Sequence, residues 1–534
     1  MKMSNRINQI ITDISYVYIG IPFILFLLGW CRWYIACIGI VAIVYAMYKA
    51  CNNELKFSGV IWTKKDIGQI ISVLLILSVW VYLSGIGAYA FQNTDHIVRN
   101  SIFEVLVHDP WPVIKDYSVN GQVSTRGLIY YIGFWLPAAA AGKLFGIQFG
   151  YFALYLWTLL GVSIVFLWIC QIRGTVSVWP VFVLIFFSGL DILGYYIVRG
   201  GFGNLTNQMH IEWWIGSGTY QFSSNTTQLF WVFNQAIPAW VIVILLYVQK
   251  NNRQIIFLLS LAMLSSTFPF VGMIPFVIYF MVTNTKQATI KEWFSDLLRN
   301  TFTIENIVAG GIVGFITFFY LMSNNVVGGT VNTSSISSEQ SIIMENEQNK
   351  QDLDKNAIQE KELLDYNITD MDMLNEQARR GVSIFKGALF LLIECGVYII
   401  IILHYNDKKE VGVIYVALVS FIVCLMIKVG EGGDFCMRAS IPGLFLLCVE
   451  VIRTIDECRN NKRYVGMAAL IILVMLGSVT PMQEINRTIQ TSLMRMDDQT
   501  AIIDTFLPEE ALLQGDNFSG KTDNSLFYKY LSAK

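Results

Sequence analysis

Long apolar runs separated by short polar connections occupy most of the chain. Many are close to the roughly 20 residues that a helix needs to cross a bilayer. Strand-like alternation of apolar and polar positions is absent, so helices rather than a barrel must satisfy the backbone within lipid. The pattern predicts an all-α, polytopic transmembrane protein with about 11 to 13 crossings. The runs cover residues 16–31, 33–49, 67–90, 128–146, 150–170, 176–198, 226–248, 255–282, 305–322, 384–403, 411–428, 439–452 and 464–480.

The composition agrees with this class. Hydrophobic residues make up 54% of the chain and charged residues only 14%, against roughly 25% charged residues in soluble domains. The net charge of −2 says nothing about nucleic acid, and no Lys/Arg cluster is large enough to suggest such a partner, so we expect the lipid bilayer and no nucleic acid as partners. Nine cysteines without a C-x-x-C pair and four histidines argue against a thiolate or histidine metal cage. An oxygen-bound divalent cation stays open as a cofactor.

The placement of basic residues predicts how the chain is oriented. Lys and Arg gather in connections near residues 2–6, 49–65, 250–253, 286–291, 408–409 and 453–463, which the positive-inside rule assigns to the cytoplasm together with the N-terminus. The same alternation places residues 91–126, 199–225, 323–383, 429–438 and the tail 481–534 outside. It requires the chain to cross the membrane an even number of times between residues 128 and 198. Three apolar blocks lie in this region, and the sequence does not show how many of them cross. The predicted regions are therefore 1–322, the outer loop 323–383, 384–480 and the outer tail.

The loop 323–383 departs from the rest in composition. It opens with glycine, serine and threonine, and between Glu339 and Arg380 it holds eleven acids against five bases. Few aromatic residues are present, which favours a solvated insertion without a catalytic part. A lid over an active site is the alternative.

The first outer loop carries the leading catalytic candidates. Apolar residues between 95 and 108 fall largely along one side at helical spacing, which predicts an interfacial helix lying on the membrane. Such a helix would hold Asp95, with its neighbour His96, close to the lipid headgroups. A carboxylate there could deprotonate an acceptor hydroxyl. The alternative is that Asp95 caps the helix.

Candidate substrate-binding residues surround Asp95 in this loop. Trp111, held in a rigid turn by two prolines, could stack on a sugar or anchor the loop at the interface. Arg126 could bind a phosphate through two parallel hydrogen bonds or serve as an interface anchor. The candidates are Arg99, Asp109, Trp111 and Arg126.

The second outer loop mixes aromatic side chains with carboxylate, amide and hydroxyl groups. This mixture suits carbohydrate, whose ring faces stack on Trp while its hydroxyls bond to polar groups. Glu212 is a further catalytic candidate in this loop. Asp191 is a carboxylate within an apolar run, where an acid indicates function unless it caps a helix break. The binding candidates are Asp191, His210, Trp213, Asn234 and Gln235.

A third candidate site lies in a glycine-rich connection between two late apolar runs. Glu431, Asp434 and Arg438 put more charge there than a short turn needs. Glycines would let backbone N–H groups approach an anion, and a helix beginning near residue 439 would point its positive end at it. The alternative is a tight loop with a salt-bridged arginine.

These features together resemble the GT-C superfamily of polyprenyl-phosphate-sugar-dependent glycosyltransferases. The resemblance rests on the many helices, on Asp95 in an early outer loop with an interfacial helix, on a broken span at 265–269 and on a late outer arginine. It implies that Asp95 acts as base or metal ligand and that Arg438 or Arg126 holds the lipid phosphate. Two spans precede the Asp95 loop and no paired-acid motif follows it, which departs from the family pattern.

The resemblance implies sugar transfer from a lipid-linked donor to a glycan or lipid-linked acceptor, during cell-envelope glycan synthesis at a bacterial cytoplasmic membrane. A polysaccharide polymerase or ligase is an alternative, with outer arginines and no first-loop base. A transporter or flippase of lipid-linked sugars is another, although the two halves show no internal repeat. A non-catalytic partner in an envelope assembly is a third.

Overall fold

The computed structural model describes residues 2–119, 122–202, 210–216, 220–287, 289–324, 384–406, 411–427, 429, 433–497, 512–513, 517–523 and 525–533. Ten helical stretches in this part of the chain are long and apolar enough to cross a membrane. This confirms the prediction of an all-α, polytopic membrane protein in contact with a lipid bilayer.

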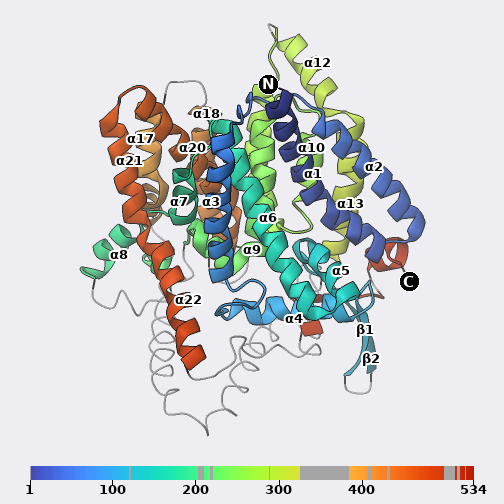
Figure 1. The fold of residues 1–534 in the computed structure, drawn as a ribbon. Coiled ribbons are helices and arrows are strands. Elements are labelled where there is room, and N and C mark those ends of the chain that lie inside the picture. The colour runs from blue at the N-terminus through green and yellow to red at the C-terminus, as the bar shows by residue number, and fades with distance from the viewer. Residues whose placement is uncertain are drawn as a thin grey trace.

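The bundle in Figure 1 is built from these stretches and from three helices that run beside them. The stretches are α1 (Lys2–Trp30), α2 (Trp33–Cys51), α3 (Lys64–Leu83), α6 (Ile147–Arg173), α7 (Trp179–Phe186) with α8 (Asp191–Arg199), α9 (Asn225–Val248), α11 (Thr267–Asn284), η4 (Glu305–Gly310) with α13 (Gly311–Met322), α16 (Ile384–Leu391) with η5 (Leu392–Gly396) and α17 (Val397–Tyr405), and α21 (Tyr464–Gly477) with α22 (Val479–Asp497). The additional helices are α10 (Ile255–Leu261), α18 (Val411–Met426) and α20 (Ile441–Asn460).

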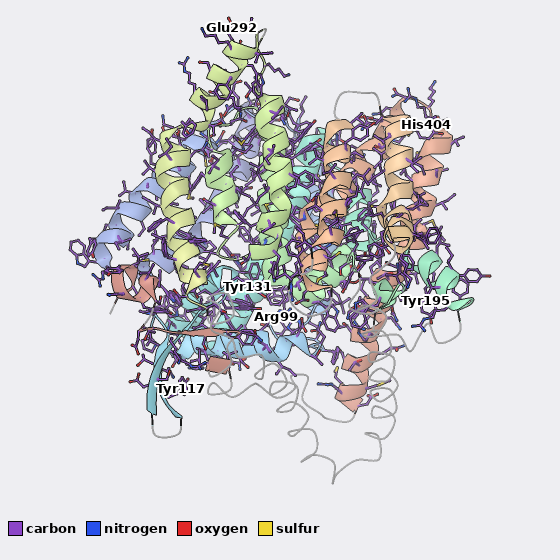
Figure 2. All side chains as sticks on the ribbon, turned by 180° about the vertical axis from the view of Figure 1, so that it is seen from behind. Arg99, Tyr117, Tyr131, Tyr195, Glu292 and His404 are labelled. Carbon is purple, nitrogen blue, oxygen red and sulfur yellow. The ribbon has the colours of Figure 1, made fainter. Side chains whose placement is uncertain are left out.

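The two ends of the bundle differ. Figure 1 shows the N-terminus and α12 (Ile290–Thr301) at one end, and α4 (Asp95–His108), the strands β1 (Ile114–Val119) and β2 (Gln122–Leu128), and the C-terminal half of α22 at the other. Figure 2 places Glu292 and His404 at the first end, and Arg99, Tyr117, Tyr131 and Tyr195 at the second. These are called the α12 end and the α4 end below.

Two of the three apolar blocks between 128 and 198 form helical stretches that are long enough to cross a membrane. The first apolar block forms η1 (Gly133–Trp135) and the ten-residue α5 (Leu136–Phe145), which packs against α6 near the α4 end. Gly146, with a φ of 92°, reverses the chain between α5 and α6 in a conformation that suits glycine. Only α6 and the α7–α8 stretch are long enough to cross.

Helix α9 lies at the centre of the bundle, and all 24 of its residues are buried. It contacts α6, α20, α11, α10, α22 and α7. Its backbone departs from helical geometry at Val232, with φ −137° and ψ 35°. Pro238 contributes to this kink, because it lacks an N–H for the Asn234 carbonyl and its ring presses on that carbonyl.

The first outer loop contains a helix, as predicted, and also a small sheet that the sequence analysis missed. Helix α4 lies across the end of the bundle (Figure 1), and β1 and β2 follow as an antiparallel hairpin. The third strand, β3 (Ser519–Lys521), pairs with β2 so that Arg126 faces Lys521. Its partner is far away in the sequence, so no local pattern could indicate the pairing.

The C-terminal region packs onto this end of the bundle. Helix α22 follows α21 almost directly, so the predicted boundary at 480 falls inside α22. The π-helical η6 (Phe527–Leu531) lies against the end of α1, where the Arg32 N–H donates to the Leu531 carbonyl at 2.9 Å. The described C-terminal residues therefore belong to the folded body.

One close helix contact depends on glycine. A Cβ atom at Gly272 of α11 would lie 1.9 Å from the carbonyl oxygen of Ala439, which ends α19 (Asp434–Ala439). We expect Gly272→Ala to separate these helices and to lower the free energy of unfolding by about 1–3 kcal/mol. Gly314→Ala is the control, because a Cβ at Gly314 of α13 would meet nothing within 4 Å. The thermal unfolding of purified protein in detergent measures both, and equal melting temperatures would contradict the packing.

Candidate functional site

Charged and tyrosine side chains from three parts of the chain meet at the α4 end. The Asp95 carboxylate lies 2.7 Å from Arg99 on α4, and the Asp434 carboxylate lies 2.7 Å from Arg438 on α19. Arg438 interacts electrostatically with both tyrosines of the 130–131 pair and with Asp95, and Tyr130 interacts with Arg99. Figure 2 labels Arg99 and Tyr131, which both lie at this end of the bundle. The arginine–tyrosine cluster is defined as Asp95, Arg99, Tyr130, Tyr131, Asp434 and Arg438.

Helix α4 presents Asp95 and Arg99 on one face, since residues four apart in a helix are neighbours. The Arg99 guanidinium lies 5.7 Å above the ring of Phe233 on α9. The side chain of Arg99 is 9% exposed, whereas that of Asp95 is 40% exposed. Thr94 makes no side-chain cap bond to the helix, and the Asp95 N–H donates to Asn93 Oδ1. The Asp95 carboxylate is therefore accessible and is held by an arginine.

Arg438 is a largely buried cation that still has an unused hydrogen-bond donor. Its Nη1 donates to Asp434, and its guanidinium lies 5.9 Å from the ring of Phe268. Burial alone would lower the pKa of Arg438, but Tyr131 and Asp434 together raise it above the ordinary value, so the charge is retained. Arg438 Nε and Arg99 Nη1 are both buried without an acceptor. Unpaired guanidinium N–H groups are costly to bury, and both would suit an anion.

His96 ties α4 to α9. Its Nδ1 lies 3.3 Å from the amide nitrogen of Gln92, and its Nε2 lies 3.2 Å from the carbonyl oxygen of Phe230. Burial, with help from Arg99, lowers the pKa of His96 to about 3. The imidazole is thus neutral and both of its nitrogens have partners, which is an arrangement for positioning α4.

His210 lies beside the cluster, between two indole rings. Its ring centre is 4.5 Å from that of Trp213 and 4.5 Å from that of Trp231. Burial and Arg487 lower the pKa of His210 to about 3, while Asp95 acts in the opposite direction. The neutral ring has Nδ1 3.6 Å from Glu484 of α22, too far for a hydrogen bond. The influence of Asp95 links this histidine to the arginine–tyrosine cluster.

Glu212, in η3 (Ile211–Trp213), organises the second outer loop. Its carboxylate accepts hydrogen bonds from Gln221 Nε2, Ser223 Oγ and the Ser224 N–H, at 2.8–2.9 Å. Burial raises the pKa of Glu212 to about 8, and the carboxyl of Asp191 adds to this effect. Trp213 Nε1 donates to Gln221 Oε1 in the same network. These contacts give both predicted residues a part in holding the loop.

The remaining candidates of the second loop lie deeper in the bundle. Asp191 begins α8 and accepts hydrogen bonds from Ser188 and Thr480. Asn234 and Gln235 are buried on α9 near its kink. Neither polar atom of the Asn234 carboxamide has a partner, and Gln235 Oε1 has none either. Such unsatisfied groups are uncommon in native interiors, which makes this part of α9 a candidate contact for a ligand.

Several predicted residues lie outside the cluster. Asp109 pairs with Lys115 at 2.9 Å. Trp111 donates to the Leu106 carbonyl and packs on Trp30 of α1, so its ring is held by contacts within the protein. Arg126 contacts Ser519 on β3. Glu431 lies outside the described residues, as do 203–209, 217–219 and 325–383 of the predicted outer loops.

Two acids near the site were missed by the sequence analysis. Glu394 is a lone acid in an apolar run, and the reasoning that singled out Asp191 would have found it. Glu484 accepts a hydrogen bond from Trp231 and pairs with Arg487 on α22. Residues 481–534 were predicted to form an outer tail, so no sequence pattern singled out Glu484 as a site residue.

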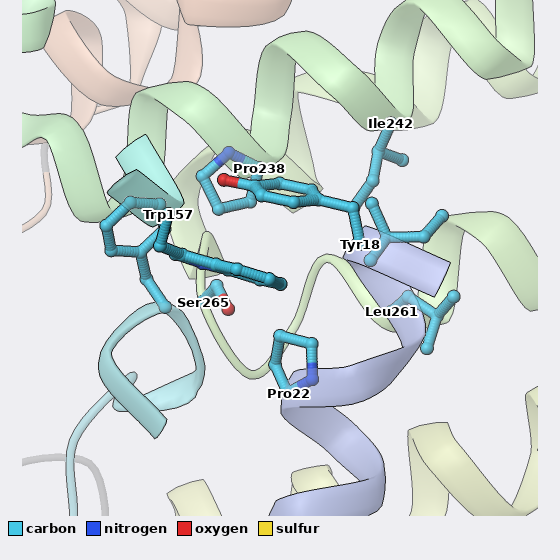
Figure 3. Close-up of a pocket in the computed structure, with 9 residues that line it drawn as sticks. Tyr18, Pro22, Trp157, Pro238, Ile242, Leu261 and Ser265 are labelled. Carbon is cyan, nitrogen blue, oxygen red and sulfur yellow. The ribbon is translucent and has the colours of Figure 1, made fainter. Parts of the chain in front are cut away.

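Metal and cavity geometry add little to the site. No group of three or more His, Cys, Asp or Glu side chains that could hold a metal ion occurs among the described residues. The pocket in Figure 3 lies inside the bundle, where apolar and aromatic side chains surround it together with Ser265. It has room for about one water molecule, so it cannot hold a sugar.

Comparisons with protein-family models, curated proteins and solved structures give no match. The fold defines the chain as a polytopic α-helical membrane protein. Any more specific function has to be argued from the residues of the α4 end.

Proposed function

We propose that this protein is a membrane glycosyltransferase that moves a sugar from a polyprenyl-phosphate-linked donor to an acceptor hydroxyl. The observation that carries the proposal is that two guanidiniums, each with a buried unused N–H group, act on the half-exposed carboxylate of Asp95: Arg99 pairs with it, and Arg438, which pairs with Asp434, interacts with it electrostatically. Anionic phosphate and a hydroxyl to be deprotonated are the two reacting groups that this arrangement would serve.

In the proposed reaction, Asp95 takes the proton of the acceptor hydroxyl as its oxygen attacks the anomeric carbon. The new glycosidic C–O bond forms while the bond from that carbon to the phosphate oxygen breaks, with inversion. The leaving phosphate carries the negative charge, which Arg438 stabilises through its planar guanidinium. Asp95 and Asp434 supply carboxylate oxygens that a divalent cation would accept as ligands.

The arrangement of α4 supports this role. Helix α4, which begins at Asp95, lies across the end of the bundle (Figure 1), and this supports a position of Asp95 at the headgroup level, where a lipid phosphate would lie. His96 and Phe233 hold this helix on α9, which limits its movement relative to Arg438. Preorganised charges of this kind stabilise the charge that develops in a transition state.

We further propose that the α12 end faces the cytoplasm and the α4 end faces outward, because the basic connections belong to the α12 end. Cysteines introduced at Asp116, an exposed residue of β1, and at Glu292, an exposed residue of α12, test this orientation. In intact cells a membrane-impermeant maleimide should label Asp116→Cys and not Glu292→Cys. The wild type, whose one exposed cysteine is Cys37, sets the baseline. Labelling of Glu292→Cys alone would reverse the orientation.

Asp95→Asn removes the proposed base and keeps the shape and polarity of the side chain. We expect transfer to fall by roughly two to four orders of magnitude, while the donor still binds. Asp116→Asn, an exposed acid of the same end, is the control and should retain full activity. An unchanged rate in Asp95→Asn would remove this carboxylate from the mechanism, and loss of folding would indicate a structural role instead.

Arg438→Lys keeps the positive charge and loses the planar two-pronged donor. If Arg438 binds phosphate, donor binding should weaken nearly as much as in Arg438→Ala. If it only pairs with Asp434, lysine should replace it with full donor affinity and a lowered melting temperature. Donor binding and melting temperature, measured on the same preparation, separate these outcomes. Arg173→Lys is the control, because that guanidinium pairs with Asp456, far from the cluster.

A transporter of lipid-linked sugars is the second candidate. The broken stretches at 187–190 and 262–266 favour it, because interrupted helices line the substrate sites of many transporters. In proteoliposomes a transporter would move a labelled donor across the bilayer without an acceptor and without Asp95. A polymerase or ligase would need the arginines and no base, so Asp95→Asn separates it from the first proposal.

A further inference from the structure

Two carboxyl groups meet inside the bundle, apart from the arginine–tyrosine cluster. Asp191 stands at the start of α8, directly after the break between α7 and α8, and Glu394 stands in the π-helical η5. Their exposed fractions are 0% and 1%. Asp191 Oδ2 accepts hydrogen bonds from Ser188 Oγ and Thr480 Oγ1, both at 2.8 Å. Glu394 Oε1 accepts one from Trp214 Nε1 at 2.5 Å.

The other oxygen of each carboxyl has only its counterpart to bond with. Asp191 Oδ1 and Glu394 Oε2 are both buried and accept no hydrogen bond from any described N–H or hydroxyl group. The two carboxyl groups interact directly with each other, and the neighbouring backbones are in contact, because the Leu190 N–H donates to the Ile393 carbonyl at 3.3 Å. Two ionised carboxylates offer acceptors and no donor, so neither can satisfy the other unless one of them carries a proton. One shared proton would satisfy both remaining oxygens at once.

A proton, rather than a basic side chain, is the group that neutralises one of the two carboxyls. Among the described residues, Glu212, Cys395, Tyr398 and Cys436 interact electrostatically with the pair, and none of these four groups carries positive charge. The Tyr398 hydroxyl is itself buried without a hydrogen-bond partner. Two negative charges without a cation would be strongly unfavourable in such an interior.

Two glycines make room for the pair. A Cβ atom at Gly189 would lie 1.7 Å from Glu394 Oε2, and one at Gly477 would lie 2.8 Å from the carbonyl oxygen of Ser188. Any larger residue at 189 would displace Glu394 from Asp191. The helix break, the glycines and the π-helical turn thus act together to bring the carboxyls into contact, and π-helical turns are frequent at functional sites.

We propose that Asp191 and Glu394 form a proton-binding site in which one proton is shared between the two carboxyls. The occupied site joins α8, η5, the start of α22 and, through Trp214, the loop that carries His210. Release of the proton leaves two like charges in the interior, which drives Glu394 away from Asp191 and frees Trp214. Proton occupancy therefore controls the position of the second outer loop, whatever reaction the protein performs.

The protonated carboxyl gives a direct test in the full-length protein. The pair should give a carbonyl-stretch band in the infrared spectrum at neutral pH that shifts in heavy water and disappears in both Asp191→Asn and Glu394→Gln. Glu212, with a pKa of about 8, gives a separate band, which is assigned by its loss in Glu212→Gln.

Glu450→Gln is the control, because Glu450 is a buried acid outside the pair that accepts hydrogen bonds from Arg453 and Tyr247; the band of the pair should remain in that variant. A band that survives in both Asp191→Asn and Glu394→Gln, or is absent from the wild type, would overturn the proposal.

A second measurement avoids dependence on any variant that fails to fold. In the wild type, raising the pH should bleach the band and lower the melting temperature over the same interval. Glu394→Gln should melt at a temperature that is constant over that interval, because its amide donates to Asp191 without a titratable proton. Wild-type protein whose band and melting temperature are both unchanged through alkaline pH would refute a releasable proton.

Discussion

The complete burial of α9 is the constraint on which the rest of the structure depends. A helix with no face toward lipid or water can satisfy its polar side chains only within the protein, and donors at the start of α9 do so, although Asn234 and Gln235 Oε1 do not. Asn225 Nδ2 donates to the Leu184 carbonyl, and Thr226 Oγ1 donates to the Ile185 carbonyl. These bonds satisfy carbonyls that the end of α7 leaves without helical partners. The start of α9 therefore permits the helix break that brings Asp191 to Glu394.

The kinked half of α9 also supports the opposite side of the candidate site. The Phe230 carbonyl accepts from Asn93 and contacts His96, and Phe233 lies beneath Arg99, so α4 is held by consecutive turns of one helix. Trp231 Nε1 donates a hydrogen bond to Glu484, and the Trp231 ring packs against His210. The arginine–tyrosine cluster and the acid pair thus share one rigid support, and a change in either is transmitted most directly through α9 and its loop.

Sequence patterns predicted the features that depend on local physics. Apolar runs indicated the helices, the amphipathic spacing indicated α4, and the break near 265 was visible from its polar residues. Asp95 interacts electrostatically with Arg438, and the prediction that both belong to one site stays a prediction, whereas Trp111 and Arg126 pack with α1 and β3. The β2–β3 pairing and the Asp191–Glu394 contact could not be predicted, because each joins residues far apart in sequence whose partners only the packing selects.

The placement of β3 and η6 has a consequence for how the protein is made. These segments pair with β2 and cover the end of α1, yet in the sequence they follow all ten of the described stretches that could cross a membrane. During synthesis the hairpin and the first helix therefore precede their partners, and their edges stay unpaired until β3 and η6 have been made. A chain that stops before β3 would carry these ten stretches and still lack a finished α4 end.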